Sequence, residues 1–309
     1  MSGNPGPADG IVFRNTDLPA LFHHTDAVAI TRQREAIGSV RRQLLLLVVG
    51  AAAAALPAWK LGDTIQLAGL ISALAYAGVL AIGIRASRSG AKSHWQLNRS
   101  AAEYIKSMCW RYSVHGTPFD ARSGDPDELF AQRLEEGLRE LSKVGWQDPR
   151  ADLPEVASGE LVTPAMRRLR EQPFGLRRET YVRDRLIEQR NWYHRSAESS
   201  RRVALVWSGT LAVLTLLALG LSLLHTFSVA GSVDALGTLS AAAAACLAWS
   251  EIRRRRPLIA AHSLVEEDLA AMHSAMETSV TEAQWPSAVY ETERIVSPQH
   301  TDWLVRHRS

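Results

Sequence analysis

The chain has 309 residues, with 35 Lys and Arg against 32 Asp and Glu, which leaves a net charge of +3. This excess is too small to argue for a nucleic-acid partner. Two cysteines, Cys109 and Cys246, exclude a disulfide scaffold and a multi-thiolate zinc domain. The average composition resembles a globular protein, but the apolar residues are segregated along the chain and indicate a helical membrane protein.

Residues 1–30 begin with a Gly-, Pro- and Asp-rich stretch, and we expect a flexible N-terminus there. The segment has one basic side chain, Arg14, and no apolar core, so it does not resemble a signal peptide. His23 and His24 have no carboxylate or thiolate at metal-ligand spacing. They are expected to be a solvated pair rather than a metal site.

Two apolar stretches follow at 44–59 and 65–84. A spanning helix needs about 20 apolar residues to cross about 30 Å of hydrocarbon. The second stretch meets this length, whereas the first is short and Ala-rich and could alone be a buried soluble helix. Because the first lies a few residues from the second, we expect one hairpin that inserts as a unit. Ser89–Ser93 resembles a phosphate-binding loop, but its glycine spacing is wrong and a membrane-proximal basic turn is favoured.

The sequence between the hairpins is predicted to be helical. A helix is expected over 91–115, with one stripe formed by Trp95, Ala102, Ile105 and Cys109. The connector 121–175 has two helix starts, Asp125-Pro126 and Thr163-Pro164, each with a capping side chain before a proline. Apolar residues recur after the first start at Phe130, Leu134, Leu138 and Leu141. We expect the connector to form a small cytoplasmic helical layer.

From Tyr181 a helical pattern runs into a third apolar stretch, 203–224, which is long enough to span. The fourth stretch covers 235–250 and is short and Ala-rich like the first; with Asp234 at its outer end, the span is taken from about 231. Pro257 is expected to kink or restart the helix that follows. An amphipathic stripe should then pack on the helix before the third span: Leu258, Ala261, Val265, Leu269, Met272 and Met276. The tail 284–309 is weakly patterned.

Basic residues flank both hairpins, whereas the turns inside them carry only Lys60, balanced by Asp63. The positive-inside rule therefore predicts that both ends of each hairpin, and both termini of the chain, are cytoplasmic. The residues that set this topology are Arg41, Arg42, Arg85, Arg88, Arg201, Arg202, Arg253, Arg254, Arg255 and Arg256. The expected fold class is an all-α integral membrane protein of two transmembrane hairpins, four spans in all, with long cytoplasmic helical extensions.

No catalytic, metal or cofactor site is expected, so the chain is not predicted to be an enzyme. The polar residues inside the spans are not ionisable, except for Asp234 at the outer edge. The lack of a buried charge at membrane depth counts against a pump or an ion-coupled transporter. Gly209, Gly220 and the run 241–245 would let helices approach closely. Packing within one chain and assembly of many copies around a pore both fit these small residues.

Two local patterns flank the hairpins. The first pattern follows the second span: Trp95, Arg99, Ala102, Glu103, Lys106, Trp110, Arg111 and Tyr112. In the second pattern, before the third span, Tyr181, Arg185 and Gln189 recur at i, i+4 spacing and precede Trp192 and Tyr193. With the hairpins, these residues resemble the SLATT domains, the SMODS- and SLOG-associated two-transmembrane effector domains of bacteria. Two subfamilies look fused in tandem, over 31–120 and 176–283.

The resemblance implies a membrane effector of a bacterial conflict or antiphage system, located in the inner membrane. It implies a homo-oligomer that forms a pore or disrupts the membrane on a nucleotide-linked signal, and a partner that makes or senses a nucleotide second messenger. The alternative is a non-conducting anchor or scaffold that recruits a soluble partner through the same cytoplasmic helices.

Within the second pattern, Arg185 and Gln189 could form hydrogen bonds across helices, and Trp192 and Tyr193 suit a wet apolar interface. Their simplest role is to join the cytoplasmic extensions of the two hairpins. A cluster of Arg183, Arg185 and Arg190 could instead hold a phosphate, although attraction to anionic lipid is the favoured interpretation.

Overall fold

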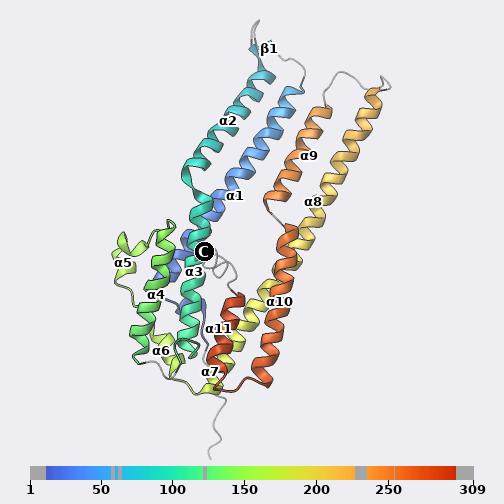
Figure 1. The fold of residues 1–309 in the computed structure, drawn as a ribbon. Coiled ribbons are helices and arrows are strands. Elements are labelled where there is room, and N and C mark those ends of the chain that lie inside the picture. The colour runs from blue at the N-terminus through green and yellow to red at the C-terminus, as the bar shows by residue number, and fades with distance from the viewer. Residues whose placement is uncertain are drawn as a thin grey trace, which may run out of the picture. The chain divides into compact units, whose positions relative to one another are not determined.

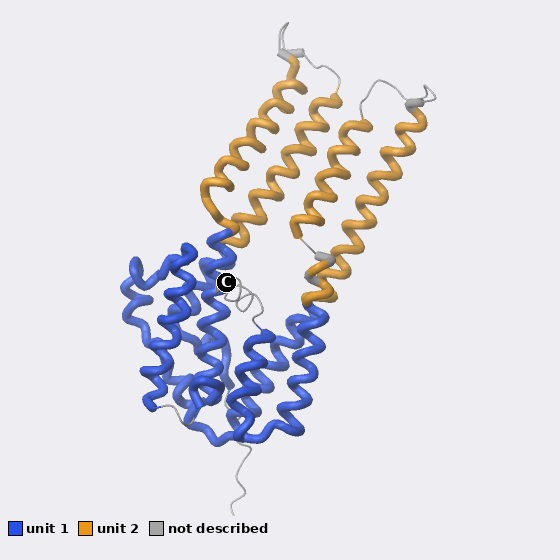
Figure 2. Tube along the Cα trace, in the orientation of Figure 1, with its two compact units in different colours: residues 1–31, 93–195, 262–309 blue, residues 32–92, 196–261 orange. Residues whose placement is uncertain are grey.

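The computed structural model describes residues 12–56, 60–61, 65–120, 124–226, 235–253 and 255–296. These residues are mostly helical (Figure 1); the exception is a two-stranded antiparallel ladder of β1 (Lys60–Leu61) and β2 (Ile65–Gln66). The chain divides into two compact units (Figure 2). Unit 1 comprises residues 1–31, 93–195 and 262–309, and unit 2 comprises residues 32–92 and 196–261.

Four helices are long and apolar enough to cross a membrane. Their apolar segments lie in unit 2 and belong to α1 (Ala20–Ala54), α2 (Leu67–Ser89), α8 (Glu188–Thr226) and α9 (Ala235–Ile252). Large apolar side chains lie on the surface of these helices, with Leu80 66% exposed, Leu205 73% and Leu216 66%. Such a surface is unfavourable in water and is expected of helices that face lipid. The prediction of an all-α membrane protein with four apolar helices is confirmed.

In unit 2, α1 and α2 approach closely. The Ser72 hydroxyl donates a hydrogen bond of 3.0 Å to the Gly50 carbonyl oxygen. A Cβ added at Gly50 would lie 3.1 Å from the Tyr76 ring, and one at Gly78 would lie 3.1 Å from Leu46. These glycines therefore allow the two helices to pack, as small residues do between membrane helices.

The glycines singled out from the sequence have different surroundings. A Cβ added at Gly209 or Gly220 would meet no atom of the described residues within 4 Å. Both glycines lie on α8, whose contact with α9 includes Trp207 and Trp249, with ring centroids 6.4 Å apart. Gly209 and Gly220 thus do not mediate helix packing within the part of this chain that the structure describes.

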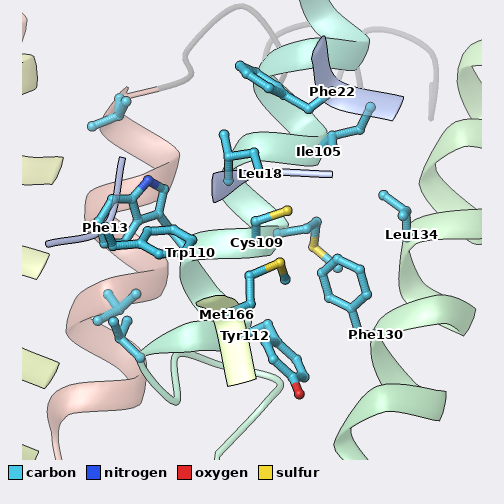
Figure 3. Close-up of a cluster of buried hydrophobic side chains, with 14 of the residues drawn as sticks. Phe13, Leu18, Phe22, Ile105, Cys109, Trp110, Tyr112, Phe130, Leu134 and Met166 are labelled. Carbon is cyan, nitrogen blue, oxygen red and sulfur yellow. The ribbon is translucent and has the colours of Figure 1, made fainter. Parts of the chain in front are cut away.

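Unit 1 is built around α3 (Ala91–Ser113). Gly90, at φ 56°, ends α2 in the left-handed region, and α3 begins at the next residue, so within Ser89–Ser93 only Gly90 lies between the two helices. The predicted stripe on α3 is confirmed at Ala102, Ile105 and Cys109, which are fully buried, whereas Trp95 is half-buried. Figure 3 shows this face of α3 directed toward α4 (Pro126–Lys143).

Both helix starts predicted in the connector are confirmed. The Asp125 carboxylate accepts hydrogen bonds from the N–H groups of Asp127 and Glu128 at the start of α4. The Thr163 hydroxyl caps α6 (Pro164–Arg170) in the same way. The short elements η2 (Pro149–Ala151) and α5 (Pro154–Ala157) lie between them. The four apolar residues expected on the inner face of α4 are buried: Phe130, Leu134, Leu138 and Leu141.

The N-terminal segment differs from the flexible chain expected over 1–30. Residues 1–11 lie outside the described residues, but η1 (Asn15–Asp17) and α1 follow at once. Phe13 and Leu21 are fully buried, and the Phe13 ring contacts the Trp110 ring at a centroid distance of 4.8 Å. The segment has too few apolar residues to form its own core, and it orders because α3 supplies the other side of the contact.

The C-terminal part confirms one expectation and corrects another. The helix restarts near Pro257, since α9 ends at Ile252 and α10 begins at Arg255. The stripe on α10 (Arg255–Thr278) buries Leu269 and Met276, and Val265 and Met272 pack against the core.

The tail, however, contains α11 (Trp285–Val296), with five of its residues buried: Trp285, Val289, Thr292, Glu293 and Val296. Residues 297–309 lie outside the description. A helix of twelve residues has too few turns to give a clear periodic signal, but its apolar face is complete once unit 1 covers it.

Candidate functional site

The site begins with a cluster of four aromatic side chains in the core of unit 1. Trp110 of α3 meets Tyr181, the last residue of α7 (Phe174–Tyr181), edge to face at a centroid distance of 5.7 Å. Tyr181 meets Trp285 of α11 in the same way at 5.6 Å, and Phe13 lies on the other side of Trp110. Edge-to-face contact is the arrangement that aromatic rings favour. The cluster joins a residue of the first sequence pattern to a residue of the second.

A buried ion pair lies beside this cluster. Arg185 belongs to the π-helical turn η3 (Val182–Ile187) that follows α7. Its Nε and Nη2 donate to the two carboxylate oxygens of Glu293 on α11, at 2.9 and 2.7 Å. The side chains of Arg185 and Glu293 are 1% and 2% exposed. The Tyr181 hydroxyl donates a third hydrogen bond to Glu293, at 3.0 Å, so this carboxylate is well satisfied in the core.

Burial and charge shift the protonation equilibria around the pair. Burial raises the pKa of the Tyr181 hydroxyl well above its usual value, and the Glu293 carboxylate raises it further. Burial by itself would lower the pKa of Arg185, but Glu293 outweighs this effect and keeps the guanidinium charged. Burial, together with the Arg185 charge, lowers the pKa of Lys106 to about 8. The Lys106 amine is therefore the group near the pair whose charge changes near neutral pH.

The remaining residues of the first pattern hold neighbouring elements to α3. The Arg111 guanidinium donates to the Thr117 carbonyl oxygen at 2.6 Å and lies over the Tyr290 ring of α11. The Tyr112 hydroxyl donates to the Asp127 carboxylate at the start of α4. Glu103 pairs with Arg99, which also contacts Asp26 of α1 at 3.1 Å. The contacts of Arg99, Arg111 and Tyr112 therefore hold α1, α11 and α4, respectively, against α3.

The second pattern is divided between the core and the surface. Tyr193 is buried, and its hydroxyl donates to the Val296 carbonyl oxygen at the end of α11, at 3.0 Å. Trp192 is 45% exposed and contacts the rings of Tyr193 and His262. Gln189 is half-buried and makes no side-chain hydrogen bond within the described part of the chain, so only Arg185 of the expected pair forms a hydrogen bond across helices.

The three arginines considered as a phosphate site each contact a different partner. Arg183 pairs with Asp184 at 2.6 Å, and Arg185 is bound to Glu293. The Arg190 Nη1 lies 3.4 Å from His273 Nδ1 on α10. Together with the contact of His194 with Glu266 at 2.9 Å, this confirms that α10 packs on the helix that leads to the third span.

The topology-setting arginines lie in unit 2. Arg41, Arg42, Arg85, Arg88, Arg201 and Arg202 are exposed. Arg253 lies over the Trp249 ring at 5.3 Å. Arg254 and the side chains of Arg255 and Arg256 lie outside the description.

Among the described residues, no three His, Cys, Asp or Glu side chains lie together in a group that could hold a metal ion. Cys109 is fully buried, and burial raises the pKa of its thiol far above the usual value. His23 and His24 lie on α1 near its start.

Sequence reasoning missed Glu293, which completes the site. Glu293 was missed because a carboxylate in a short helix is normally expected to face solvent, whereas this one lies on the buried face of α11. The spacing of Trp285, Val289 and Val296 is the signal that could have shown its buried position.

Comparison with protein families gives two matches. Residues 19–178 match SMODS and SLOG-associating 2TM effector domain 3, and residues 181–303 match SMODS and SLOG-associating 2TM effector domain 1. The chain belongs to the SLATT family. It carries two SLATT domains in tandem, from two subfamilies, as the sequence patterns predicted. No curated protein and no solved structure matches the chain.

The matched ranges place the site across both SLATT domains. The first match includes the connector 121–175, and the second includes α11. Trp110 belongs to the first match, whereas Tyr181, Arg185 and Glu293 belong to the second. SLATT domains are two-transmembrane effector domains of conflict systems, so this chain holds two such effector domains whose residues share one core in unit 1.

Proposed function

We propose that this protein is a membrane effector of a bacterial antiphage system, which assembles from several copies in the inner membrane and permeabilises it on a nucleotide-linked signal. The observation that carries the proposal is the tandem pair of SLATT effector domains with four lipid-type helices. Unit 1 is the cytoplasmic part in this proposal and receives the signal. The expected partner is a protein that makes or senses a nucleotide second messenger.

Helix continuity supports a link from unit 1 to the spans. Helices α1 and α8 each contain residues of both units, without a break in the helix. The motif residues of both SLATT domains pack together in one core in unit 1, and helices of both hairpins are continuous with residues of that core. A change in that core would therefore reach both hairpins through the helical backbone.

The four apolar stretches, 44–59, 65–84, 203–224 and 235–250, contain no Asp, Glu, Lys, Arg or His, which supports a passive pathway rather than coupled transport. The polar groups of the third span include Thr210 and Thr215, whose hydroxyls donate to carbonyl oxygens one turn earlier in the same helix. Transporters and pumps usually need a charged group at membrane depth. No enzymatic activity is part of this proposal.

The second candidate function is a non-conducting anchor that recruits a soluble partner. The layer of α4 to α6 favours it, because this layer adds a folded surface to unit 1 beyond what a hairpin needs. Its exposed charged residues include Arg133 and Glu136, which pair with each other at 3.0 Å and are available to a partner.

Single-channel recording of the purified full-length chain in planar bilayers tests the proposal. We expect discrete conductance steps once the partner encoded beside it and that partner's nucleotide product are added. Leu216→Arg, which places a charge in the third span, should abolish the steps, whereas Leu216→Ile should keep them. A bilayer that stays silent with partner and nucleotide present contradicts the pore and leaves the anchor.

A further inference from the structure

The helix that leads to the third span contains an irregular turn. Residues 174–226 are helical throughout, but η3 (Val182–Ile187) is a π-helical turn between α7 and α8. A π turn holds one residue more than the α-helix around it and is less favourable, so it persists where surrounding contacts hold it. The contacts of η3 therefore show what maintains the extra residue.

Two consecutive residues of η3 are held by opposite ends of the chain. The Asp184 carboxylate accepts a hydrogen bond of 3.0 Å from the backbone N–H of Phe13. Arg185 donates two hydrogen bonds to Glu293 of α11, and Tyr181, one turn earlier, donates to the same carboxylate. The Arg185 Nη1 is buried and has no hydrogen-bond partner among the described residues. Among the described residues, Glu293 is thus the acidic side chain that is hydrogen-bonded to Arg185, and Glu103 adds a weaker electrostatic attraction.

The other side of the turn is open. A groove of about 470 Å³ runs along η3, and its lining includes Val182, Arg183 and Ile187 of the turn with Met276 of α10. The turn is therefore held on its inner side by Phe13 and Glu293 and has free space on its outer side. This space could take up side chains that move when the turn changes.

We propose that η3 is a switch in helix register. The contacts of Phe13 with Asp184 and of Glu293 with Arg185 hold it in the observed state, and it changes state when the Glu293 contact breaks. When Glu293 leaves, Arg185 would be an unpaired charge in the core. The turn then relaxes to α-helix and moves Arg185 toward water. Relaxation of the π turn to α-helix shifts the register of the backbone hydrogen bonds by one residue. This shift turns α8 by about 100° relative to α7 and moves it by about 1.5 Å along its axis. This regulation goes beyond the proposed function, and its test does not depend on conduction.

Spin-label distances within unit 1 test the switch. Nitroxide labels on Glu179→Cys of α7 and Arg195→Cys of α8 report the rotation of one helix relative to the other in the full-length protein. The wild-type background should give one distance population. Glu293→Gln should give a second population, whereas Glu291→Gln, a matched change of an exposed residue on the same helix, should not.

Hydrogen exchange separates a register change from general unfolding. In Glu293→Gln, we expect at least tenfold faster exchange over 182–190, with unchanged protection over 101–109 of α3. A single wild-type distance in Glu293→Gln, or equal loss of protection in both segments, overturns the proposal.

A second variant keeps the test decisive if Glu293→Gln does not fold. Asp184→Asn weakens the other contact of the turn at a less buried residue, and it should produce the same second distance at a lower population. If Asp184→Asn folds and shows only the wild-type distance, the switch is excluded.

Discussion

At the residue scale, Arg185 and Glu293 depend on each other because both side chains are buried in the observed state. Removing one partner from a buried pair leaves an unpaired charge and typically costs about 3–5 kcal/mol, whereas replacing both with apolar residues is often neutral. We expect Arg185→Met to lower the free energy of unfolding by that amount and Arg185→Met with Glu293→Leu to recover most of it. Denaturant unfolding in detergent, followed by near-UV circular dichroism, measures both. A double variant as unstable as the single one would contradict this account.

Titration of Lys106, beside the ion pair, should make the free energy of unfolding depend on pH. Its pKa in the folded state, about 8, lies below the usual lysine value near 10.5 because of burial and the Arg185 charge. Between these two values the unfolded chain binds more protons than the folded one, so stability should rise with pH from about 8 toward 10. Below pH 8 the amine is charged in both states and this gain is absent.

Substitution of Lys106 tests that dependence. Lys106→Met removes the titrating group and should give a flatter stability profile between pH 7.5 and 9.5. At pH 7 it should be at least as stable as the wild type, because a buried charge is removed. Unfolding midpoints across this pH range provide the measurement, and a wild-type slope in Lys106→Met would show that another group titrates.

At the element scale, the packing of α4 on α3 requires a glycine. A Cβ at Gly137 would lie 2.2 Å from the Tyr104 ring, and the Tyr104 hydroxyl is held by a hydrogen bond to the Arg133 carbonyl oxygen. Gly137→Ala should therefore destabilise unit 1 by about 1–3 kcal/mol, as overpacking does. Gly175→Ala on α7, where no described atom lies within 4 Å, should be neutral or stabilising by up to about 1 kcal/mol. Thermal unfolding of the two variants compares them directly, and equal midpoints would show that Tyr104 adjusts without cost.

The elements differ in how well local sequence predicts them. Asp125 and Thr163 mark helix starts that rest on hydrogen bonds within three residues, and both starts are observed. The segment around Phe13 and the helix α11 are stabilised by contacts with α3 and with the helical stretch of α7, η3 and α8. Their own residues carry weak patterns because most of their stabilising contacts are with residues far away in the chain.

At the scale of the whole molecule, the distribution of arginines predicts the orientation in the membrane. We expect Ser228→Cys, between the third and fourth spans in the sequence, to react with a membrane-impermeant maleimide added to intact spheroplasts. Arg133→Cys on α4 should react only after permeabilisation. The two native cysteines are buried and serve as the background control in the unmodified protein. Labelling of Arg133→Cys in intact spheroplasts would mean the reverse orientation.

The amino-acid sequence by itself determined the four apolar segments, the helix starts and the SLATT resemblance. Each depends on residues close together in the chain: a run long enough to cross hydrocarbon, a cap before a proline, or a motif at helical spacing. Only the tertiary structure decided that Arg185 pairs with Glu293, 108 residues away, and that Phe13 holds the neighbouring Asp184. Such contacts depend on which helix faces meet in unit 1. That choice is set by the combined burial of many weakly patterned segments rather than by any one of them.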